Sequence, residues 1–497
     1  MKQQLLATFK NKISDNKIII MSVLFLMLLL LFTYFVYQST SLNYLPIFSD
    51  EYGYYLDAKS FWLYNRIDAP LTLNESYSLV GHAGFHGIMY SIFYGSFFKL
   101  LAFLGIDPSI TLVNMVLVFF LFAILVYSRM DLEDKLLIGI VFLSNFIFII
   151  YISSSMSEIF HYSFAVVVGY LLHLVYKTRE NRYLYLLIGL IFLLIFFRES
   201  WVFVFFGLFP LAKSFKDIVK YSIVLLIGLV VVILYQKYFQ AAYVIDYFHN
   251  LKLQLDSGSP IDVLHSVYDR FLINLDKYFV TEEYERYRFV FYCKYLFTIV
   301  LLYALYASFR TRSRTILSGT IIAFVFFSSL LVLYDPFGWR EVRVLAAPFI
   351  LLTVILILNK KHIAVYLIVL FQLLTINAVI DTKQNIDLKR QKMNLQIKES
   401  QALLNDFSEF GKYLDFYEKK RVVVLMDWNL IPVDSSAMIY QLPLFLNGKN
   451  ISYSFIYRHF DIMDSICDLY ISNKEEKNGN MKLIGKNQNF YFYRRFH

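Results

Sequence analysis

Cysteine and charge are both scarce in this chain of 497 residues. It has only two cysteines, Cys293 and Cys467, and their wide separation without CxxC spacing argues against a disulfide framework and a zinc site. Charged residues make up 17% of the chain, whereas hydrophobic residues make up 58%. This apolar content exceeds what a soluble core of this size requires, so the sequence indicates an integral membrane protein.

No internal repeat, heptad array or low-complexity tract is evident, and no small-x-small cleavage site follows the first apolar run at 18–37. Four lysines precede this run, so we expect an uncleaved signal anchor with its N-terminus in the cytoplasm. The formal net charge of +9 lies in short basic runs between apolar stretches, as the positive-inside rule predicts. We therefore expect a lipid bilayer, and no nucleic acid, as the partner of these residues.

Apolar runs of membrane-spanning length recur through the first 380 residues and predict about eleven transmembrane helices. They lie at 18–37, 109–128, 136–152, 159–176, 183–197, 200–212, 219–236, 290–308, 315–333, 344–358 and 361–380. The run at 200–212 is short and begins beside Arg198 and Glu199, so a half-membrane helix is the alternative there.

A further apolar stretch, 88–104, is interrupted by Gly95, Ser96 and Lys99. If it crossed the membrane, the basic residues of the following loops would fall outside, so we expect an interfacial helix. The outer face then collects the segments 38–108, 153–158, 237–289, 334–343 and everything after 380. High Lys, Ile, Asn, Phe and Tyr usage suits an A/T-rich genome, and the expected location is a bacterial inner membrane.

The composition becomes polar after Asp381, which predicts a domain boundary between 1–380 and 381–497. A charged helix is expected across 385–420. Strand-like runs follow at 422–424, 451–456, 468–471, 482–484 and 490–493. We therefore expect an all-α polytopic membrane domain followed by a small α/β extracytoplasmic domain.

Two adjacent acids, Asp50 and Glu51, follow the first predicted span, with no basic residue beside them in the sequence. Ser49 is placed to cap a helix that begins here, and Asp50, Tyr54 and Asp57 then share one helix face. Acids in a first helical turn also stabilise the helix dipole, by only about 0.3–1 kcal/mol, and this is the purely structural interpretation.

Pro46, Asp50, Glu51, Tyr54 or Tyr55, and Ala58 together resemble the first outer loop of the GT-C membrane glycosyltransferases. The similarity is to the superfamily of dolichyl-phosphate-mannose protein mannosyltransferases and bacterial aminoarabinose transferases, and it extends in outline over residues 18–380. The resemblance implies a GT-C-like fold, a polyprenyl-phosphate sugar donor, and Asp50 as the catalytic residue. A carboxylate in hydrogen-bond reach of an acceptor hydroxyl can take its proton as it attacks.

The leaving polyprenyl phosphate needs cations in place, and Arg340 and Arg343 supply two guanidinium groups at the outer mouth of a span. The following Ala346-Ala347-Pro348 resembles the arginine and proline element of the family. Snorkelling of each arginine to the interface is the structural alternative. Arg198 is a weaker candidate for the same phosphate.

Glu158, in the next outer turn, is a second candidate catalytic acid, although the family usually carries Asp there; helix capping is its structural alternative. Candidate substrate-binding residues are Tyr54, Tyr55, His82, His86 and His161. Glycines around His82 and His86 disfavour a helix that would pair them on a metal, so we expect no cofactor. A divalent metal is the alternative, and the spacing does not support it.

The favoured function is an inverting glycosyltransferase with Asp50 as base, supported by Glu51 and Glu158, and an acceptor that is a glycan, lipid or protein. The residues select neither the sugar nor the acceptor. A lipid-linked glycan polymerase or ligase is the alternative, with its chemistry in the 237–289 loop. A transporter or flippase ranks last, because the polar residues collect at helix ends rather than in mid-span.

Overall fold

The computed structural model of this chain is mostly helical and carries one small sheet. It describes residues 46, 49–68, 71–72, 87–239, 254, 258, 260–279, 288–333, 339–399, 405–406, 409, 411, 422–427, 451–456, 468–475 and 481–495. The predicted signal anchor at 18–37 lies outside these residues.

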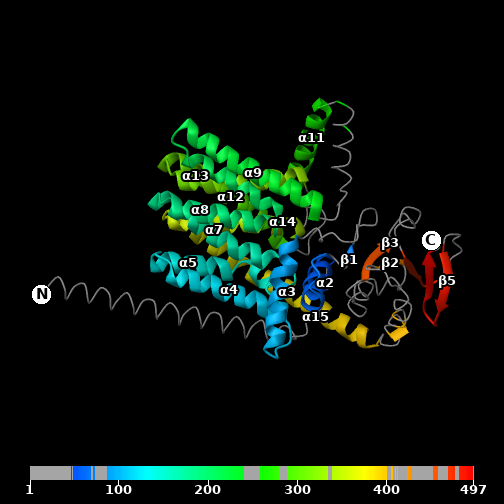
Figure 1. The fold of residues 1–497 in the computed structure, drawn as a ribbon. Helices are drawn as coiled ribbons and strands as arrows, with labels where there is room; N and C mark the ends of the chain where they lie inside the picture. Colours follow the sequence, from blue (N-terminus) through cyan, green and yellow to red (C-terminus); the bar gives the residue numbers. More distant parts are fainter. Residues whose placement is uncertain are drawn as a thin grey trace.

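The helices that form the body of the molecule lie side by side in a bundle (Figure 1). In chain order they are α4 (Ile110–Tyr127), α5 (Leu132–Leu143), α6 (Phe146–Tyr151), α7 (Glu158–Thr178), α8 (Asn181–Ile195), η1 (Glu199–Leu211), α9 (Phe215–Phe239), α12 (Arg288–Thr311), α13 (Arg314–Leu333), α14 (Trp339–Leu358) and α15 (His362–Glu399). Every predicted span within the described residues coincides with one or two of these elements.

Six described helices are long and apolar enough to cross a membrane: α4, α7, α9, α12, α13 and α15. They mark the chain as a membrane protein. Four further helices, α3, α8, η1 and most of α14, are apolar but shorter. The predicted count of about eleven spans therefore stays a prediction.

The predicted span 136–152 is two helices rather than one. The first helix ends at Leu143, and Asn145 caps the second, because its Oδ1 accepts a hydrogen bond from the backbone N–H of Ile147 at 2.9 Å. The predicted short span at 200–212 is a 3-10 helix, η1. Because a 3-10 helix rises about 2.0 Å per residue, this short element reaches further across a membrane than an α-helix of equal length.

Two helices, α2 (Ser49–Tyr64) and α3 (Ile88–Phe103), run across one end of the bundle rather than along it (Figure 1). They pack tightly where Gly95 of α3 faces α2, since a Cβ on Gly95 would lie 2.8 Å from the carbonyl oxygen of Ala58. The predicted interfacial helix at 88–104 thus coincides with α3. A helix that the sequence did not predict, α11 (Pro260–Phe279), lies in the segment expected to be a loop.

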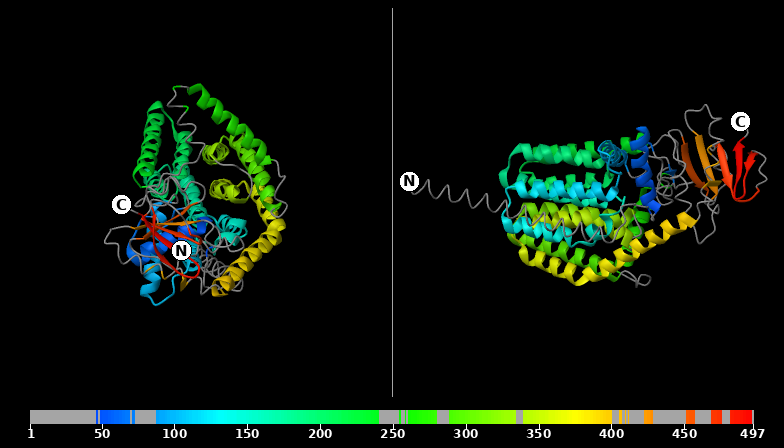
Figure 2. Two further views of the ribbon diagram at one scale, coloured as in Figure 1. Left: turned by 90° about the vertical axis from the view of Figure 1, so that its right-hand side faces the viewer. Right: turned by 90° about the horizontal axis from the view of Figure 1, so that it is seen from below.

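A six-stranded sheet stands beyond α2 and α3 at the same end (Figure 2). Its strand order is β1-β3-β2-β4-β6-β5. The strands are β1 (Leu71–Thr72), β2 (Val422–Asp427), β3 (Ile451–Ile456), β4 (Leu469–Ser472), β5 (Met481–Lys486) and β6 (Tyr491–Arg495). Strands β1 to β4 pair in parallel, and β6 pairs antiparallel with both β4 and β5. The five predicted strand runs coincide with β2 to β6.

Two features connect the sheet to the bundle. The short strand β1 comes from the segment after α2, yet it pairs with β3 of the C-terminal part. Helix α15 runs without a break across the predicted boundary at 380 and extends from the bundle toward the sheet (Figure 2). The residues expected to begin a separate charged helix at 385 therefore continue α15 as far as Glu399.

Candidate active site where four helices begin

Four elements begin close together at the end of the bundle that faces the sheet. Asp50 lies in the first turn of α2, Glu158 is the first residue of α7, Arg198 directly precedes η1, and Arg343 lies near the start of α14. Helix N-termini carry partial positive charge and unpaired N–H groups, which explains why acids collect in their first turns. The same geometry favours an anionic ligand at this place.

The close approach of α7 and α14 sets the distance between Glu158 and Arg343. A Cβ on Gly169 of α7 would lie 3.1 Å from the carbonyl oxygen of Leu351 and 3.2 Å from Cβ of Val354, both on α14. These contacts lie a similar number of residues after Glu158 and after Arg343, so the two helices run in the same direction. Their first turns therefore meet at one end of the bundle.

Four charged side chains from these elements form one connected cluster, here named the Asp50 network. Nη2 of Arg343 donates to Oδ2 of Asp50 at 2.8 Å, across 293 residues of sequence. Nε of Arg343 lies 3.3 Å from Oε1 of Glu158, and Nη2 of Arg198 lies 3.4 Å from the same oxygen. Glu158 thus holds two guanidinium groups with one carboxylate oxygen, and Asp50 pairs with one of them.

Tyr54 and Ser157 support this network from one side. The Tyr54 hydroxyl is hydrogen bonded to Oγ of Ser157 at 3.0 Å, and that Oγ also accepts from Nη2 of Arg198 at 3.2 Å. Burial raises the pKa of the Tyr54 phenol to about 12, with the Arg198 guanidinium acting in the opposite direction. The phenol is therefore neutral near pH 7, and it orients Ser157 rather than serving as a base.

Glu51, the neighbour of Asp50, belongs to a second cluster, here named the Glu51 network. Its Oε1 accepts from Nη2 of Arg390 of α15 at 3.0 Å, and Oγ of Ser154 donates to the same oxygen. Nη1 of Arg390 lies 3.3 Å from Asp387, whose other oxygen lies 2.6 Å from Nζ of Lys383. Two acids and two bases are again balanced, now between α2 and α15.

A serine-rich loop, 153–157, lies between the two networks and is buried throughout. Besides the bonds of Ser154 and Ser157, Oγ of Ser155 donates to the backbone oxygen of Glu51 at 2.8 Å. Behind the loop, Nδ2 of Asn114 donates to the backbone oxygens of Ile152 at 2.9 Å and Ser154 at 3.1 Å. The loop therefore fixes the Glu51 carboxylate and the first turn of α2 against the bundle.

Exposure separates the two networks. The side chains of Asp50, Arg198 and Arg343 are 30%, 23% and 16% exposed, respectively. Those of the Glu51 network are no more than 8% exposed, and Glu51 itself is fully buried. Asp50 is therefore accessible from solvent, whereas Glu51 is enclosed by its partners.

The other predicted substrate- and phosphate-binding residues lie outside the Asp50 network or outside the described residues. His161 is buried one turn along α7 from Glu158, and its Nδ1 accepts from Nε1 of Trp201 at 2.8 Å, which places the ring proton on Nε2. Tyr55 is half-buried and packs against Phe98 of α3 with ring centroids 6.3 Å apart. Arg340 lies in the first turn of α14, but its side chain, like His82 and His86, lies outside the described residues.

Asp57 shares the face predicted for Asp50 but joins a different group. It is buried beside Arg66 and Asp68, which form an ion pair at 3.0 Å. Burial raises the pKa of the Asp57 carboxyl well above its ordinary value; the nearby Arg66 lowers it, but by less. Since Arg66 also donates to the backbone oxygen of Ile451 in β3, this group joins the end of α2 to the sheet.

The described part of the chain contains no group of three or more His, Cys, Asp or Glu side chains that could hold a metal ion. Both acids of the Asp50 network instead face guanidinium groups. The arrangement thus offers a carboxylate that can take up a proton and two guanidinium groups that match the geometry of a phosphate.

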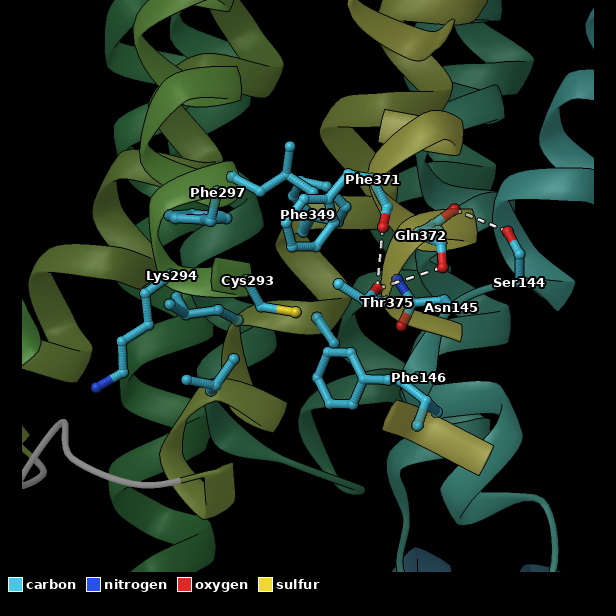
Figure 3. Close-up of a pocket in the computed structure, with 15 residues that line it drawn as sticks. Ser144, Asn145, Phe146, Cys293, Lys294, Phe297, Phe349, Phe371, Gln372 and Thr375 are labelled. Atoms are coloured by element: carbon cyan, nitrogen blue, oxygen red, sulfur yellow. Dashed lines mark hydrogen bonds between the residues drawn. The ribbon is translucent and has the colours of Figure 1, made fainter. Parts of the chain in front are cut away.

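A mostly apolar pocket lies between α12, α14, α15 and the break between α5 and α6 (Figure 3). Val342, Ala346 and Phe349 of α14 form one wall; Val342 directly precedes Arg343 on that helix, and the other two follow it. Gln372 and Ser144 lie on the opposite side, with Oγ of Ser144 donating to Oε1 of Gln372 at 2.8 Å. The polar groups at this edge are satisfied by one another, so the pocket suits an apolar occupant.

The sequence missed Arg390, Asp387 and Lys383 as partners of Glu51. Their i, i+4 and i, i+3 spacing in a predicted helix is a local signal for an ion-pair ladder. Spacing could not show that Glu51 joins this ladder, because 339 residues separate Glu51 from Arg390. No protein-family model, no curated protein and no solved structure matches this chain, so its function is argued from the site.

Proposed function

We propose that this protein is an inverting membrane glycosyltransferase that takes its sugar from a polyprenyl-phosphate donor, with Asp50 as general base. One observation carries the proposal. A partly exposed carboxylate and two guanidinium groups, from elements far apart in the sequence, converge where four helices begin at one end of a membrane bundle. A base beside a phosphate anchor is what transfer from a sugar phosphate to a hydroxyl requires.

In the proposed reaction, the oxygen of an acceptor hydroxyl attacks the anomeric carbon of the donor sugar. Its proton passes to the Asp50 carboxylate as the new glycosidic bond forms. The bond between the anomeric carbon and the phosphate oxygen breaks, and the electron pair leaves with the polyprenyl phosphate. Arg343 and Arg198 stabilise the charge that grows on this phosphate. One displacement without a covalent intermediate inverts the anomeric centre.

The two remaining acids have supporting roles in this proposal. Glu158 holds both guanidinium groups at their distances, and its side chain is only 2% exposed, so it positions the arginines and does not take up the proton. Glu51 is fully buried against Arg390, and it fixes the first turn of α2, where Asp50 lies. Tyr54 acts through Ser157 on Arg198.

The apolar pocket supports a donor with a lipid chain. Because Val342, which precedes Arg343 on α14, and Ala346 and Phe349, which follow it, line the pocket, an alkyl chain whose phosphate lies on Arg343 would have this apolar surface beside it. The rest of a polyprenyl chain would extend into the bilayer.

The proposed topology has a GT-C-like arrangement of about eleven spans, in which α2 and α3 lie at the outer membrane surface. The site and the sheet, with the rest of 381–497, then face away from the cytoplasm of a bacterial cell. The orientation of α2 and α3 across the end of the bundle supports the interfacial placement (Figure 1). The acceptor, a glycan, lipid or protein of the cell envelope, would reach Asp50 from this side.

Transfer of a radiolabelled sugar tests the proposal directly. Membranes that contain the wild type, Asp50→Asn or Arg343→Ala are supplied with labelled polyprenyl-phosphate sugars, and label is followed into acceptor. Asp50→Asn should abolish transfer and retain donor binding, whereas Arg343→Ala should weaken donor capture. Glu133→Gln, at the opposite end of the bundle, is the matched control for loss of a negative charge and should behave as wild type. Unchanged transfer in Asp50→Asn would remove Asp50 from the role of base.

A further inference from the structure

The proposed base and the proposed phosphate anchor are bound to each other. Nη2 of Arg343 donates to Oδ2 of Asp50 at 2.8 Å, and Nη1 donates to Sδ of Met156 at 3.8 Å. Nε lies 3.3 Å from Oε1 of Glu158, an ion pair without hydrogen-bond geometry. A phosphate that binds this guanidinium through two neighbouring nitrogens must therefore take the place of Asp50 at Nη2 or approach Nε beside Glu158.

The charges show why a carboxylate must leave. In the Asp50 network, two acids balance two guanidinium groups. A phosphodiester brings one more negative charge, which would lie against Asp50 if nothing moved. Like charges in such a partly buried place repel one another strongly, because water screens them poorly.

Asp50 is the acid that can leave with less cost. Its side chain is 30% exposed and lies in the first turn of α2, so its carboxylate can turn toward water. Glu158 is 2% exposed and contacts both guanidinium groups, so moving it would strand a buried charge. Arg343 would stay attached to Glu158 while Asp50 is replaced.

We propose that the donor phosphate displaces Asp50 from Arg343, so that donor binding itself releases the base for the acceptor hydroxyl. This inference rests on the proposed function and adds an order of events to it. The donor binds first, and the acceptor meets a reactive carboxylate only afterwards. Without donor, Asp50 is held by the guanidinium and cannot deprotonate water or an early acceptor.

Substitution of an ordinary binding residue weakens ligand binding, whereas the proposed displacement predicts that substitution of Asp50 strengthens it. If Asp50 competes with the phosphate for Arg343, removing its charge should tighten phosphate binding while it abolishes transfer. The probe is polyprenyl phosphate without sugar, titrated onto the detergent-solubilised full chain. Asp50→Asn and Asp50→Ala should each bind it about fivefold more tightly than wild type. This factor corresponds to the free energy that one partly exposed ion pair contributes.

Two further variants serve as controls for the binding measurement. Arg343→Ala should bind polyprenyl phosphate more weakly than wild type, because the anchor is gone. Glu133→Gln removes an equal charge at the far end of the bundle, where its partner is His362 at 3.0 Å, and should leave the affinity unchanged. A gain confined to the Asp50 variants therefore reports local competition and not the net charge of the protein.

A measurement on the wild type alone covers the case in which an Asp50 variant does not fold. Labelling of Asp50 by a water-soluble carbodiimide, read by mass spectrometry of the peptide around residue 50, should increase when polyprenyl phosphate is added. Equal or weaker binding by the Asp50 variants, or labelling that does not increase, overturns the displacement and leaves the proposed function in place if Arg343→Ala weakens binding. Affinity that is the same in wild type and Arg343→Ala overturns both.

Discussion

Asp50 and Glu51 are adjacent in the chain, yet their carboxylates belong to two networks with the same composition and different exposure. Each network balances two acids with two bases. The Asp50 network leaves its carboxylate 30% exposed, whereas the Glu51 network encloses its carboxylate completely. The difference teaches that the number of ion pairs does not identify a site. Exposure does, because a buried balanced cluster has no edge that a substrate can approach.

Removing the charge of Asp50 should have the largest effect on activity. Asp50→Asn removes the proposed base, and general-base catalysis contributes about 10²- to 10⁴-fold, so the rate of the proposed sugar transfer should fall by that factor. Its stability should change by less than about 1 kcal/mol, because the ion pair with Arg343 is partly exposed. Transfer rates and thermal unfolding in the same detergent measure both. If Asp50→Asn lost several kcal/mol of stability, the loss of transfer could come from unfolding, and the contrast between the Asp50 and Glu51 networks would be contradicted.

The opposite pattern is expected for the Glu51 network. Arg390→Ala leaves the fully buried Glu51 carboxylate without its guanidinium, which should reduce the free energy of unfolding by about 3–5 kcal/mol. The double variant Glu51→Gln/Arg390→Ala removes the stranded charge and should recover much of this loss. Denaturant unfolding of the two variants gives the comparison. If the double variant is no more stable than the single one, Arg390 does not act by neutralising Glu51.

The group around Asp57 should make the stability of the protein depend on pH. Burial raises the pKa of the Asp57 carboxyl in the folded protein, so folding holds a proton that the unfolded chain releases. This contribution to stability is complete below the unfolded pKa of about 3.9 and is lost as the pH rises through the folded pKa. Asp57→Asn should therefore flatten the fall in stability toward neutral pH. Melting temperatures of both proteins from pH 4 to pH 8 test this, and parallel curves would contradict it.

The smallest effect is expected at Tyr54. Tyr54→Phe removes only the hydroxyl bonded to Ser157, so stability should decrease by about 0.5–1.5 kcal/mol. If Ser157 helps to hold Arg198 for the donor, the KM for donor should rise while kcat changes little. Steady-state kinetics with varied donor measure the two constants. A fall in kcat with unchanged KM would place Tyr54 in the chemical step instead.

Much of the helical architecture and the strands β2 to β6 could be predicted, because apolar runs and β-branched segments are local signals. The break at Asn145 could not, since a capped interruption leaves the apolar run unchanged. Helix α11 was missed because only one face of it is apolar, with Asn274 and Tyr278 buried, and its hydropathy is too low for a span.

The candidate site divides in the same way. Asp50 was predicted from its resemblance to the first outer loop of the GT-C glycosyltransferases. Glu158, Arg198 and Arg343 were predicted from charged residues at the expected ends of spans. Which acid meets which base was beyond the sequence, as the pairing of Glu51 with Arg390 shows. Their separation into two networks follows from how α2 lies across the starts of α7 and α14 and against α15, and no local pattern encodes that placement.

Helix α15 connects the bundle, the helix α2 and the region of the sheet. Its 38 residues make one rod of about 57 Å, with one end in the bundle and the other near the sheet. Arg390 of this helix binds Glu51 in the first turn of α2, and Arg66, just after the end of α2, binds the backbone of β3. Because these two contacts hold α2 from both sides, we expect a movement of the sheet relative to the bundle to shift the helix that carries Asp50.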